Sequence, residues 1–166
     1  VLVGLGVSLD RQTWTKPSGR YEAALVQGNI DQTIKWDADQ RLNNVRKHMQ
    51  LSEDHWDTDI LIWPEFALTL YGQDALAVTD LLHRRGKSSQ TNVVIGMPDV
   101  QWQDKERYQV FNSAQGFGQA SGKFAKYHLV PFGDYVPLQH YLRGFIEFFD
   151  LPMSKASRGA RQQANI

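Results

Sequence analysis

The stretch DILIWPE, residues 59–65, decides the class of fold. Its apolar part, residues 59–63, is too short for a helix, and Pro64 closes it because proline cannot donate a hydrogen bond to a neighbouring strand. The sequence therefore predicts a buried strand over residues 59–63, and Glu65 follows at the point where that strand ends.

Two more short apolar runs lie on either side of this stretch. Residues 21–27 (YEAALVQ) end at the turn signal Gly28-Asn29, and residues 91–97 (TNVVIGM) form the other run. Apolar runs of this length, bounded by turn residues, are typical of buried strands. The sequence thus predicts one strand before and one strand after the central one.

Segments with helical spacing separate these predicted strands. Apolar side chains recur three and four apart in residues 37–51 and again in residues 73–85, where Gly86 is expected to stop the helix. Around residues 109–115 and 122–127, runs of Phe, Val and Tyr separated by glycines predict a hairpin added to the sheet. The order strand, helix, strand, helix, strand predicts an α/β fold with helices packed on a sheet.

Composition and charge narrow the class of protein further. The chain has 166 residues, and its Lys plus Arg and its Asp plus Glu both total 18, so the formal net charge is zero. This length has room for one domain, and the balanced charge argues against a nucleic-acid partner. The chain contains no cysteine, which excludes a disulfide or a thiol nucleophile within these residues.

An apolar segment, residues 1–9, opens the chain. It is much shorter than the roughly 20 residues that a helix needs to cross a bilayer. Two interpretations stay open: a frayed terminus, or the end of a membrane helix followed by a polar linker. The expected division has residues 1–20 as the end of a membrane helix and linker, and residues 21–166 as a separate folded domain.

Two charged residues have positions that point to chemistry. Glu65 follows a predicted strand, and Lys126 lies after another apolar run, just before the sequence HLVPFG. Strand ends are where α/β sheets place their ligands. A carboxylate and an ammonium group at this edge would serve as general base and as stabiliser of an oxyanion. The alternative is that both are ordinary surface charges.

Several stretches carry a resemblance to a known family. In chain order they are ALVQGNI from Ala24, KWD from Lys35, IWPE from Ile62, GKFAKYHLVPFGDYVP from Gly122, and LPMS with SRG within residues 151–159. Together they resemble the apolipoprotein N-acyltransferase branch of the nitrilase superfamily. The resemblance implies an α-β-β-α sandwich, of which residues 21–166 would form the N-terminal part, truncated before the strand that carries the nucleophile.

The superfamily works with a triad of Glu, Lys and Cys, and the resemblance assigns the first two to Glu65 and Lys126. The cysteine is expected beyond Ile166, so residues 1–166 alone are expected to be inactive. In the intact enzyme the thiolate would take an acyl chain from a phospholipid as a thioester. The N-terminal diacylglyceryl-cysteine of an apolipoprotein would then receive it. The resemblance also implies no cofactor and a place in the bacterial inner membrane, with the catalytic domain on the periplasmic side.

The same resemblance suggests further site residues. Trp36, in KWD, matches a tryptophan near the family's active site, with a packing aromatic as the alternative. Asp134, in FGDYVP, stands where many relatives have Glu, and it is expected to orient Lys126. His128 is expected to hold its loop rather than to transfer protons. The histidines share no ligand spacing, so no metal site is predicted.

Some alternatives stay open at this point. The apolar cluster in residues 138–153 fits core packing, but it also fits a lid that contacts the membrane. The chain could be half of a soluble nitrilase-type amidase, which would share the Glu and Lys, or a non-catalytic truncated product. The stretches LVPFGDYVP and LPMS favour the acyltransferase.

Overall fold

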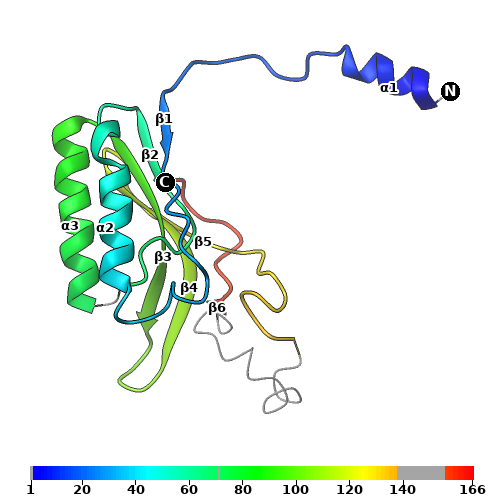
Figure 1. The fold of residues 1–166 in the computed structure, drawn as a ribbon. Coiled ribbons are helices and arrows are strands. Elements are labelled where there is room, and N and C mark those ends of the chain that lie inside the picture. The colour runs from blue at the N-terminus through cyan, green and yellow to red at the C-terminus, as the bar shows by residue number, and fades with distance from the viewer. Residues whose placement is uncertain (1, 71, 138–155) are drawn as a thin grey trace.

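The computed structural model describes residues 2–70, 72–137 and 156–166, and it shows an α/β fold built on one mixed sheet (Figure 1). The strands are β1 (Ala23–Leu25), β2 (Ile60–Trp63), β3 (Asn92–Trp102), β4 (Tyr108–Gly118), β5 (Lys123–Ala125) and β6 (Ala156–Ser157). All three strands predicted from the apolar runs are present.

The sheet has the order β1-β2-β3-β4-β5, and β6 pairs with β4. The first three strands are parallel, whereas β4 is antiparallel to both β3 and β5. The predicted hairpin is confirmed as β4 and β5. The strand predicted over residues 91–97 is longer than expected because β3 pairs with β4 along its whole length, up to Trp102 and Tyr108.

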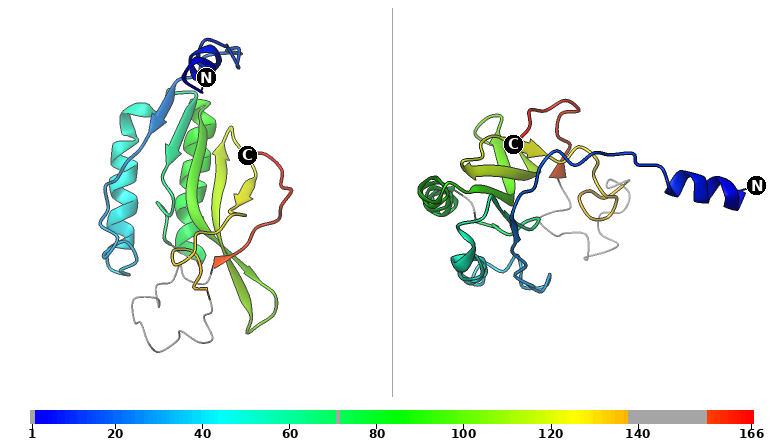
Figure 2. Two further views of the ribbon diagram at one scale, coloured as in Figure 1. Left: turned by 90° about the vertical axis from the view of Figure 1, so that its right-hand side faces the viewer. Right: turned by 90° about the horizontal axis from the view of Figure 1, so that it is seen from above.

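Two long helices, α2 (Arg41–Leu51) and α3 (Gly72–Ser89), lie side by side on one face of the sheet (Figure 2). A short 3-10 helix, η1 (Glu53–His55), follows α2. Helix α2 begins later than the predicted residue 37 because the side chain of Asp37 accepts a hydrogen bond from the Asp39 N–H, at 3.0 Å. Such local side-chain bonds favour turns over helix.

The predicted stop at Gly86 is wrong, because α3 continues to Ser89. A Cβ at Gly86 would lie 2.8 Å from the Cα of Gly118 and 3.1 Å from the carbonyl oxygen of Thr91. The glycine therefore lets the helix approach β4 closely rather than ending it.

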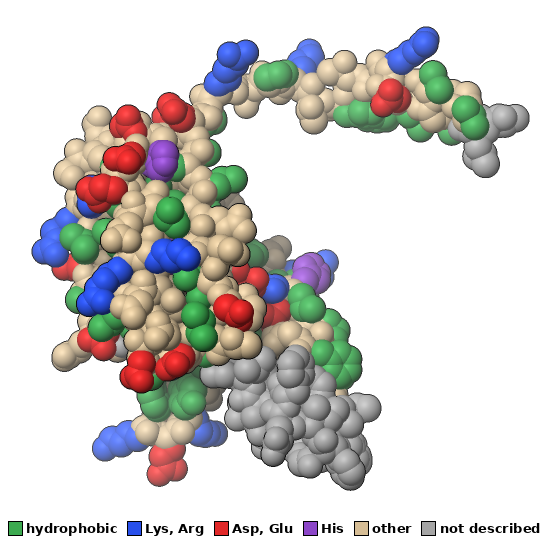
Figure 3. Space-filling model, in the orientation of Figure 1, with side chains coloured by type: hydrophobic (Ala, Val, Ile, Leu, Met, Phe, Trp, Pro, Cys, Tyr) green, Lys and Arg blue, Asp and Glu red, His purple; other side chains and the backbone are tan. Residues whose placement is uncertain are grey.

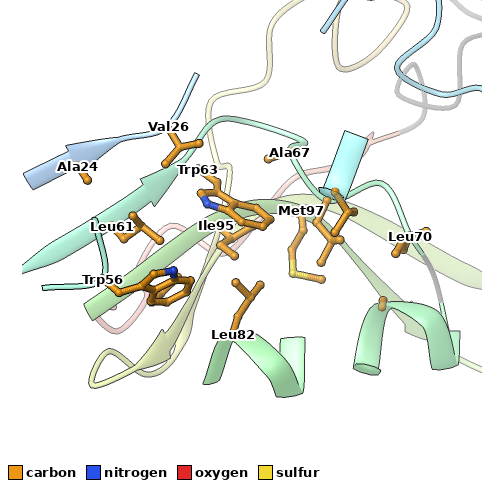
Figure 4. Packing of buried hydrophobic residues seen from close by; sticks show 14 residues of the cluster. Ala24, Val26, Trp56, Leu61, Trp63, Ala67, Leu70, Leu82, Ile95 and Met97 are labelled. Atoms are coloured by element: carbon orange, nitrogen blue, oxygen red, sulfur yellow. The ribbon is translucent and has the colours of Figure 1, made fainter. Parts of the chain in front are cut away.

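The core fills the space between α3 and the sheet (Figure 4). Leu61 and Trp63 of β2, Ile95 of β3 and Leu82 of α3 are each at most 2% exposed. Burying side chains of this size contributes about 1.5–3 kcal/mol each. Trp63 also donates a hydrogen bond from its indole N–H to Ser52 Oγ, at 2.9 Å, so its polar atom is satisfied. This packing holds β2, and with it the start of the following turn, in place.

The N-terminal helix α1 (Leu2–Asp10) stands away from the sheet at the end of an extended segment (Figure 1). Its apolar side chains Val3, Leu5, Val7 and Leu9 are exposed, and Figure 3 shows this apolar surface along α1. Within the described residues, each helix is too short or too polar to cross a membrane. The division at residue 20 stays a prediction, and the cluster in residues 138–153 lies outside the described residues.

Candidate active site

Strand register brings the predicted catalytic residues to the same end of the sheet, where the parallel strands have their carboxyl ends. Trp63 of β2 is paired with Ile95, so Glu65 follows just beyond the end of β2. On β5, Ala125 is paired with Ser113 of β4, and the N–H of the next residue, Lys126, donates to the Asn112 carbonyl at 2.7 Å. Because β5 runs in the same direction as β2, both charged residues lie at carboxyl ends of strands, as the sequence predicted.

The turn that presents Glu65 packs tightly against β3. A Cβ at Gly96 would lie 2.4 Å from the Pro64 carbonyl oxygen and 2.6 Å from the Glu65 Cα, so only glycine fits there. Phe66, the next residue, has a φ of 52° although it is bulky and buried. Such a backbone conformation costs on the order of 1–3 kcal/mol and is concentrated at functional sites.

The two predicted catalytic side chains are in contact, and Asp134 joins them. The Lys126 Nζ lies 3.1 Å from Glu65 Oε1 and 2.9 Å from Asp134 Oδ2. The three side chains differ in exposure, with relative values of 58% for Glu65, 30% for Lys126 and 5% for Asp134. The ammonium group therefore bridges one open carboxylate, which a substrate can reach, and one buried carboxylate, which it cannot.

Asn112 of β4 is a member of this cluster that sequence reasoning missed. Its buried side-chain N–H₂ group donates to Glu65 Oε1 and, at 3.1 Å, to Asp134 Oδ1. The amide therefore ties the two carboxylates together on the side away from solvent. Asn112 is one of several polar residues in β4, so the sequence gives no signal that singles it out or specifies its partners.

The cluster holds Lys126 and Asp134 in their ionised states. Burial alone would lower the pKa of Lys126, but hydrogen bonds to Asp134 and Glu65, together with their negative charges, outweigh burial and raise it. Burial alone would raise the pKa of Asp134, but hydrogen bonds from the Val130 N–H, Lys126 and Asn112 lower it. Lys126 is therefore a cation and Asp134 an anion near neutral pH.

The loop after Lys126 fixes the position of Asp134. The Val130 N–H donates to Asp134 Oδ2 at 2.8 Å, and the Asp134 N–H donates back to the Val130 carbonyl at 2.9 Å. Further along the chain, the Ala156 N–H donates to the Asp134 carbonyl and the Gly159 N–H to the Lys126 carbonyl, both at 3.0 Å. Residues 156–159, which include the SRG stretch, thus support the two charged residues through their backbones.

A cavity of about 340 Å³ opens beside Glu65 and Lys126. It is lined by Gln32, Lys35, Trp36, Glu65, Phe66, Lys126, Val130, Phe132, Gly133 and Asp134. The Trp36 ring packs edge-on against Phe66, with the ring centroids 5.3 Å apart. The structure therefore brings all four predicted site residues, Trp36 among them, to one cavity.

Two other residues lie near the site, and their structural roles differ. Lys35, which sequence reasoning did not single out, donates from Nζ to the Glu65 carbonyl at 2.9 Å and so braces the turn that carries the carboxylate. His128 is exposed, packs against the Tyr127 ring at 4.8 Å and is not among the residues that line the cavity. Among the described residues, no His, Asp and Glu side chains form a group of three that could hold a metal ion.

This arrangement suits acyl chemistry at a carbonyl group. An exposed carboxylate can accept a proton from a nucleophile, and a charged lysine beside it can stabilise the oxyanion that then forms. A mixed sheet that carries a glutamate and a lysine at the carboxyl ends of two strands, with helices packed on it, defines a nitrilase-like class of enzyme. Residues 22–165 match the family model of carbon-nitrogen hydrolases, and the chain belongs to that family.

Apolipoprotein N-acyltransferases of two bacterial genera are among the curated relatives that this chain matches. The chain is 33% identical to an apolipoprotein N-acyltransferase of Vibrio parahaemolyticus over 100% of its own length and 34% of the relative's length. It is 36% identical to an apolipoprotein N-acyltransferase of Pseudomonas putida over 96% of its length and 32% of the relative's. The chain therefore spans about a third of the length of the curated relatives it matches.

Solved structures show a weaker similarity. A crystal structure of an N-terminal amidase is 20% identical, with a TM-score of 0.43, over 66% of this chain and 28% of that one. A crystal structure of an N-terminal amidase with a Gln-Gly peptide is 18% identical, with a TM-score of 0.46, over the same shares of the two chains.

Proposed function

We propose that this chain is part of an apolipoprotein N-acyltransferase, which transfers an acyl chain from a phospholipid to the N-terminal diacylglyceryl-cysteine of apolipoproteins. The observation that carries the proposal is the Lys126 ammonium group held between the exposed Glu65 and the buried Asp134. The names of the curated relatives support an acyl transfer to an apolipoprotein. The phospholipid donor is part of the proposal. The enzyme would act at the bacterial inner membrane, with this domain on the periplasmic side.

In the first half-reaction, a cysteine thiol outside residues 1–166 attacks the ester carbonyl of the phospholipid. Glu65 accepts the thiol proton, and the new C–S bond forms as the carbonyl becomes an oxyanion beside Lys126. The C–O bond then breaks, and Glu65 returns the proton to the leaving alkoxide. The products are a thioester acyl-enzyme and a lysophospholipid.

In the second half-reaction, the amino group of the diacylglyceryl-cysteine attacks the thioester carbonyl. Glu65 takes a proton from the nitrogen, a C–N bond forms, and Lys126 stabilises the second oxyanion in the same position. The C–S bond breaks and the thiolate recovers a proton. The thioester keeps the acyl chain on the enzyme while the lysophospholipid leaves and the acceptor arrives.

The other residues of the site position these groups. Asp134 and Asn112 hold Lys126 and Glu65 through hydrogen bonds, and the paired charges keep the lysine cationic. Trp36 packs on Phe66 at the wall of the cavity and would face the bound substrate. Because residues 1–166 contain no cysteine, we expect no acyl transfer from these residues alone.

The test uses the full-length protein in detergent or liposomes, with a phospholipid donor and a synthetic diacylglyceryl-cysteine peptide. We expect N-acylated peptide and one lysophospholipid for each acyl group transferred. A Lys123→Ala variant is a matched control for Lys126→Ala. Lys123 lies three residues earlier, at the start of β5, and forms an ion pair with Asp99 of β3 at 2.7 Å that is separate from the Lys126 cluster. Hydrolysis of a small amide with no peptide acylation would instead support an amidase.

A further inference from the structure

A second cavity, of about 240 Å³, adjoins the first one. The two cavities share Gln32, Lys35 and Phe66 as lining residues. The second cavity lies between the segment after β1, helix α2 and the turn after β2, at the same edge of the sheet as Glu65. Side-chain amides and a threonine line much of it, and none of its described lining residues is acidic.

Helix α2 presents two buried polar groups to this second cavity. Asn44 and His48, one turn apart, are only 6% and 2% exposed. Within the described part of the chain, Asn44 Nδ2 and His48 Nε2 have no hydrogen-bond partner. Buried polar atoms without partners are rare in folded proteins because each one costs free energy. Both atoms therefore need a hydrogen-bond partner that the described protein groups do not supply.

The hydrogen-bonding character of these two atoms can be assigned. The Asn44 Nδ2 group is a donor. His48 Nδ1 lies 2.7 Å from the Asn44 carbonyl oxygen, which can only accept, so Nδ1 carries the proton and Nε2 of the neutral ring is an acceptor. Burial lowers the pKa of His48, and the charges of Lys35 and Lys47 lower it further, which favours the neutral ring.

Gly28 keeps the Nε2 edge of the His48 ring free of a side chain. Gly28 lines the same cavity, and a Cβ on it would lie 2.7 Å from both Cε1 and Nε2 of His48. Gly28 is not among the described glycines that have a positive φ. The backbone conformation therefore does not require glycine at this position, whereas the space beside the imidazole does.

We propose that the second cavity is a subsite for the peptide backbone of the acyl acceptor, an inference that rests on the function proposed above. An occupant has to accept a hydrogen bond from Asn44 and donate one to His48. A peptide unit offers both a carbonyl and an N–H without a charge, whereas a phosphodiester oxygen alone cannot donate and an ammonium group alone cannot accept. A lipid headgroup that carries both charged groups is the alternative that the experiment below separates from a peptide. Only the Cα and carbonyl carbon separate the acceptor's reacting amine from its first peptide N–H, and the two cavities share Gln32, Lys35 and Phe66, so the acceptor backbone would extend from the first cavity toward the second.

The experiment compares Asn44→Leu with Asn43→Leu in the full-length protein. Asn43 is the neighbouring, exposed residue on α2, bonded to Arg46, so it controls for the substitution itself. Acyl-enzyme formation from phospholipid and the kcat/KM for a diacylglyceryl-cysteine peptide are measured separately. For Asn44→Leu we expect a roughly three- to tenfold lower acceptor kcat/KM, with acyl-enzyme formation unchanged. The melting temperature is expected to hold or rise, because the variant removes an unpaired buried donor.

A second part of the experiment uses the wild-type protein and changes the acceptor instead. An acceptor whose first peptide N–H is replaced by an ester oxygen cannot donate to His48, and we expect the wild-type kcat/KM to fall by roughly three- to tenfold. Unchanged acceptor kinetics in both parts of the experiment would overturn the proposal. A loss confined to acyl-enzyme formation would also overturn it and assign the cavity to a lipid headgroup. A wild-type protein that forms no acyl-enzyme would refute the proposed function instead.

Discussion

Lys126 contacts two carboxylates that differ in solvent exposure, and this difference gives them different roles in the proposed reaction. Glu65 is exposed to the cavity and is positioned to exchange protons, whereas Asp134 is buried and fixed by the Val130 N–H and Asn112. The ammonium group is thus held by one carboxylate while the other stays accessible. A surface ion pair alone would not require this arrangement.

Glu65→Gln is expected to lower the rate of acyl-enzyme formation by about 10²–10⁴-fold, because the amide cannot accept the thiol proton. Lys126→Ala is expected to lower it by about 10²–10³-fold through loss of oxyanion stabilisation. Rapid-quench measurements of acyl-enzyme with a labelled phospholipid report both rates. A Glu65→Gln enzyme that is acylated at the wild-type rate would remove Glu65 from the mechanism.

Asp134→Asn is expected to shift the alkaline limb of the pH–rate profile to lower pH. Asp134 contributes to the raised pKa of Lys126, so removing its charge lowers that pKa. Lys126 then loses its proton, and its ability to stabilise an oxyanion, at a lower pH. Asp134→Glu keeps the charge and is expected to retain most of the wild-type profile. An alkaline limb that stays in place in Asp134→Asn would show that the pair does not control the lysine.

At the scale of elements, the turn after β2 positions Glu65. Gly96 allows β3 to contact the backbone of Pro64 and Glu65, and Lys35 holds the Glu65 carbonyl from the other side. Phe66 adopts a positive φ so that its ring is buried while Glu65 stays exposed. The carboxylate is therefore held by rigid elements rather than by a free loop.

Gly96→Ala is expected to displace this turn and to lower activity per folded molecule by about 10²-fold, since a displacement near 1 Å costs about that much. Gly86→Ala is the control, because it also crowds the sheet, at Gly118, but far from Glu65. Both variants are expected to lose about 1–3 kcal/mol of stability. Equal activity per folded molecule in the two variants would argue against positioning by Gly96.

The elements differ in how well the sequence predicts them. Short apolar runs bounded by Pro64 and Gly28 predict β1 and β2 because the signal, an apolar run that a turn residue closes, is local in the sequence. Gly86 misled the prediction, since a glycine that ends a helix and one that lets a helix approach a strand look alike in sequence. The approach depends on Gly118, which is distant along the chain.

At the scale of the whole molecule, the strand order decides what the site contains. Glu65 and Lys126 follow strands that are separated by β3 and β4, so their contact needs the complete sheet. The motifs beside Glu65 and Lys126 predicted a catalytic role for each of them. The role of Asn112 depends on the register of β4, which the neighbouring sequence does not reveal. The same holds for the second cavity, where Gly28 meets His48 of α2.

The most direct test of the central claim is the intact mass of the full-length protein after incubation with a phospholipid of one defined acyl chain. The account predicts a mass increase of one acyl group on a cysteine, removed by neutral hydroxylamine as a thioester would be, and strongly reduced in Glu65→Gln at the same short incubation time. A wild-type protein that carries no acyl adduct, or a Glu65→Gln protein that carries as much adduct at that time, would contradict it.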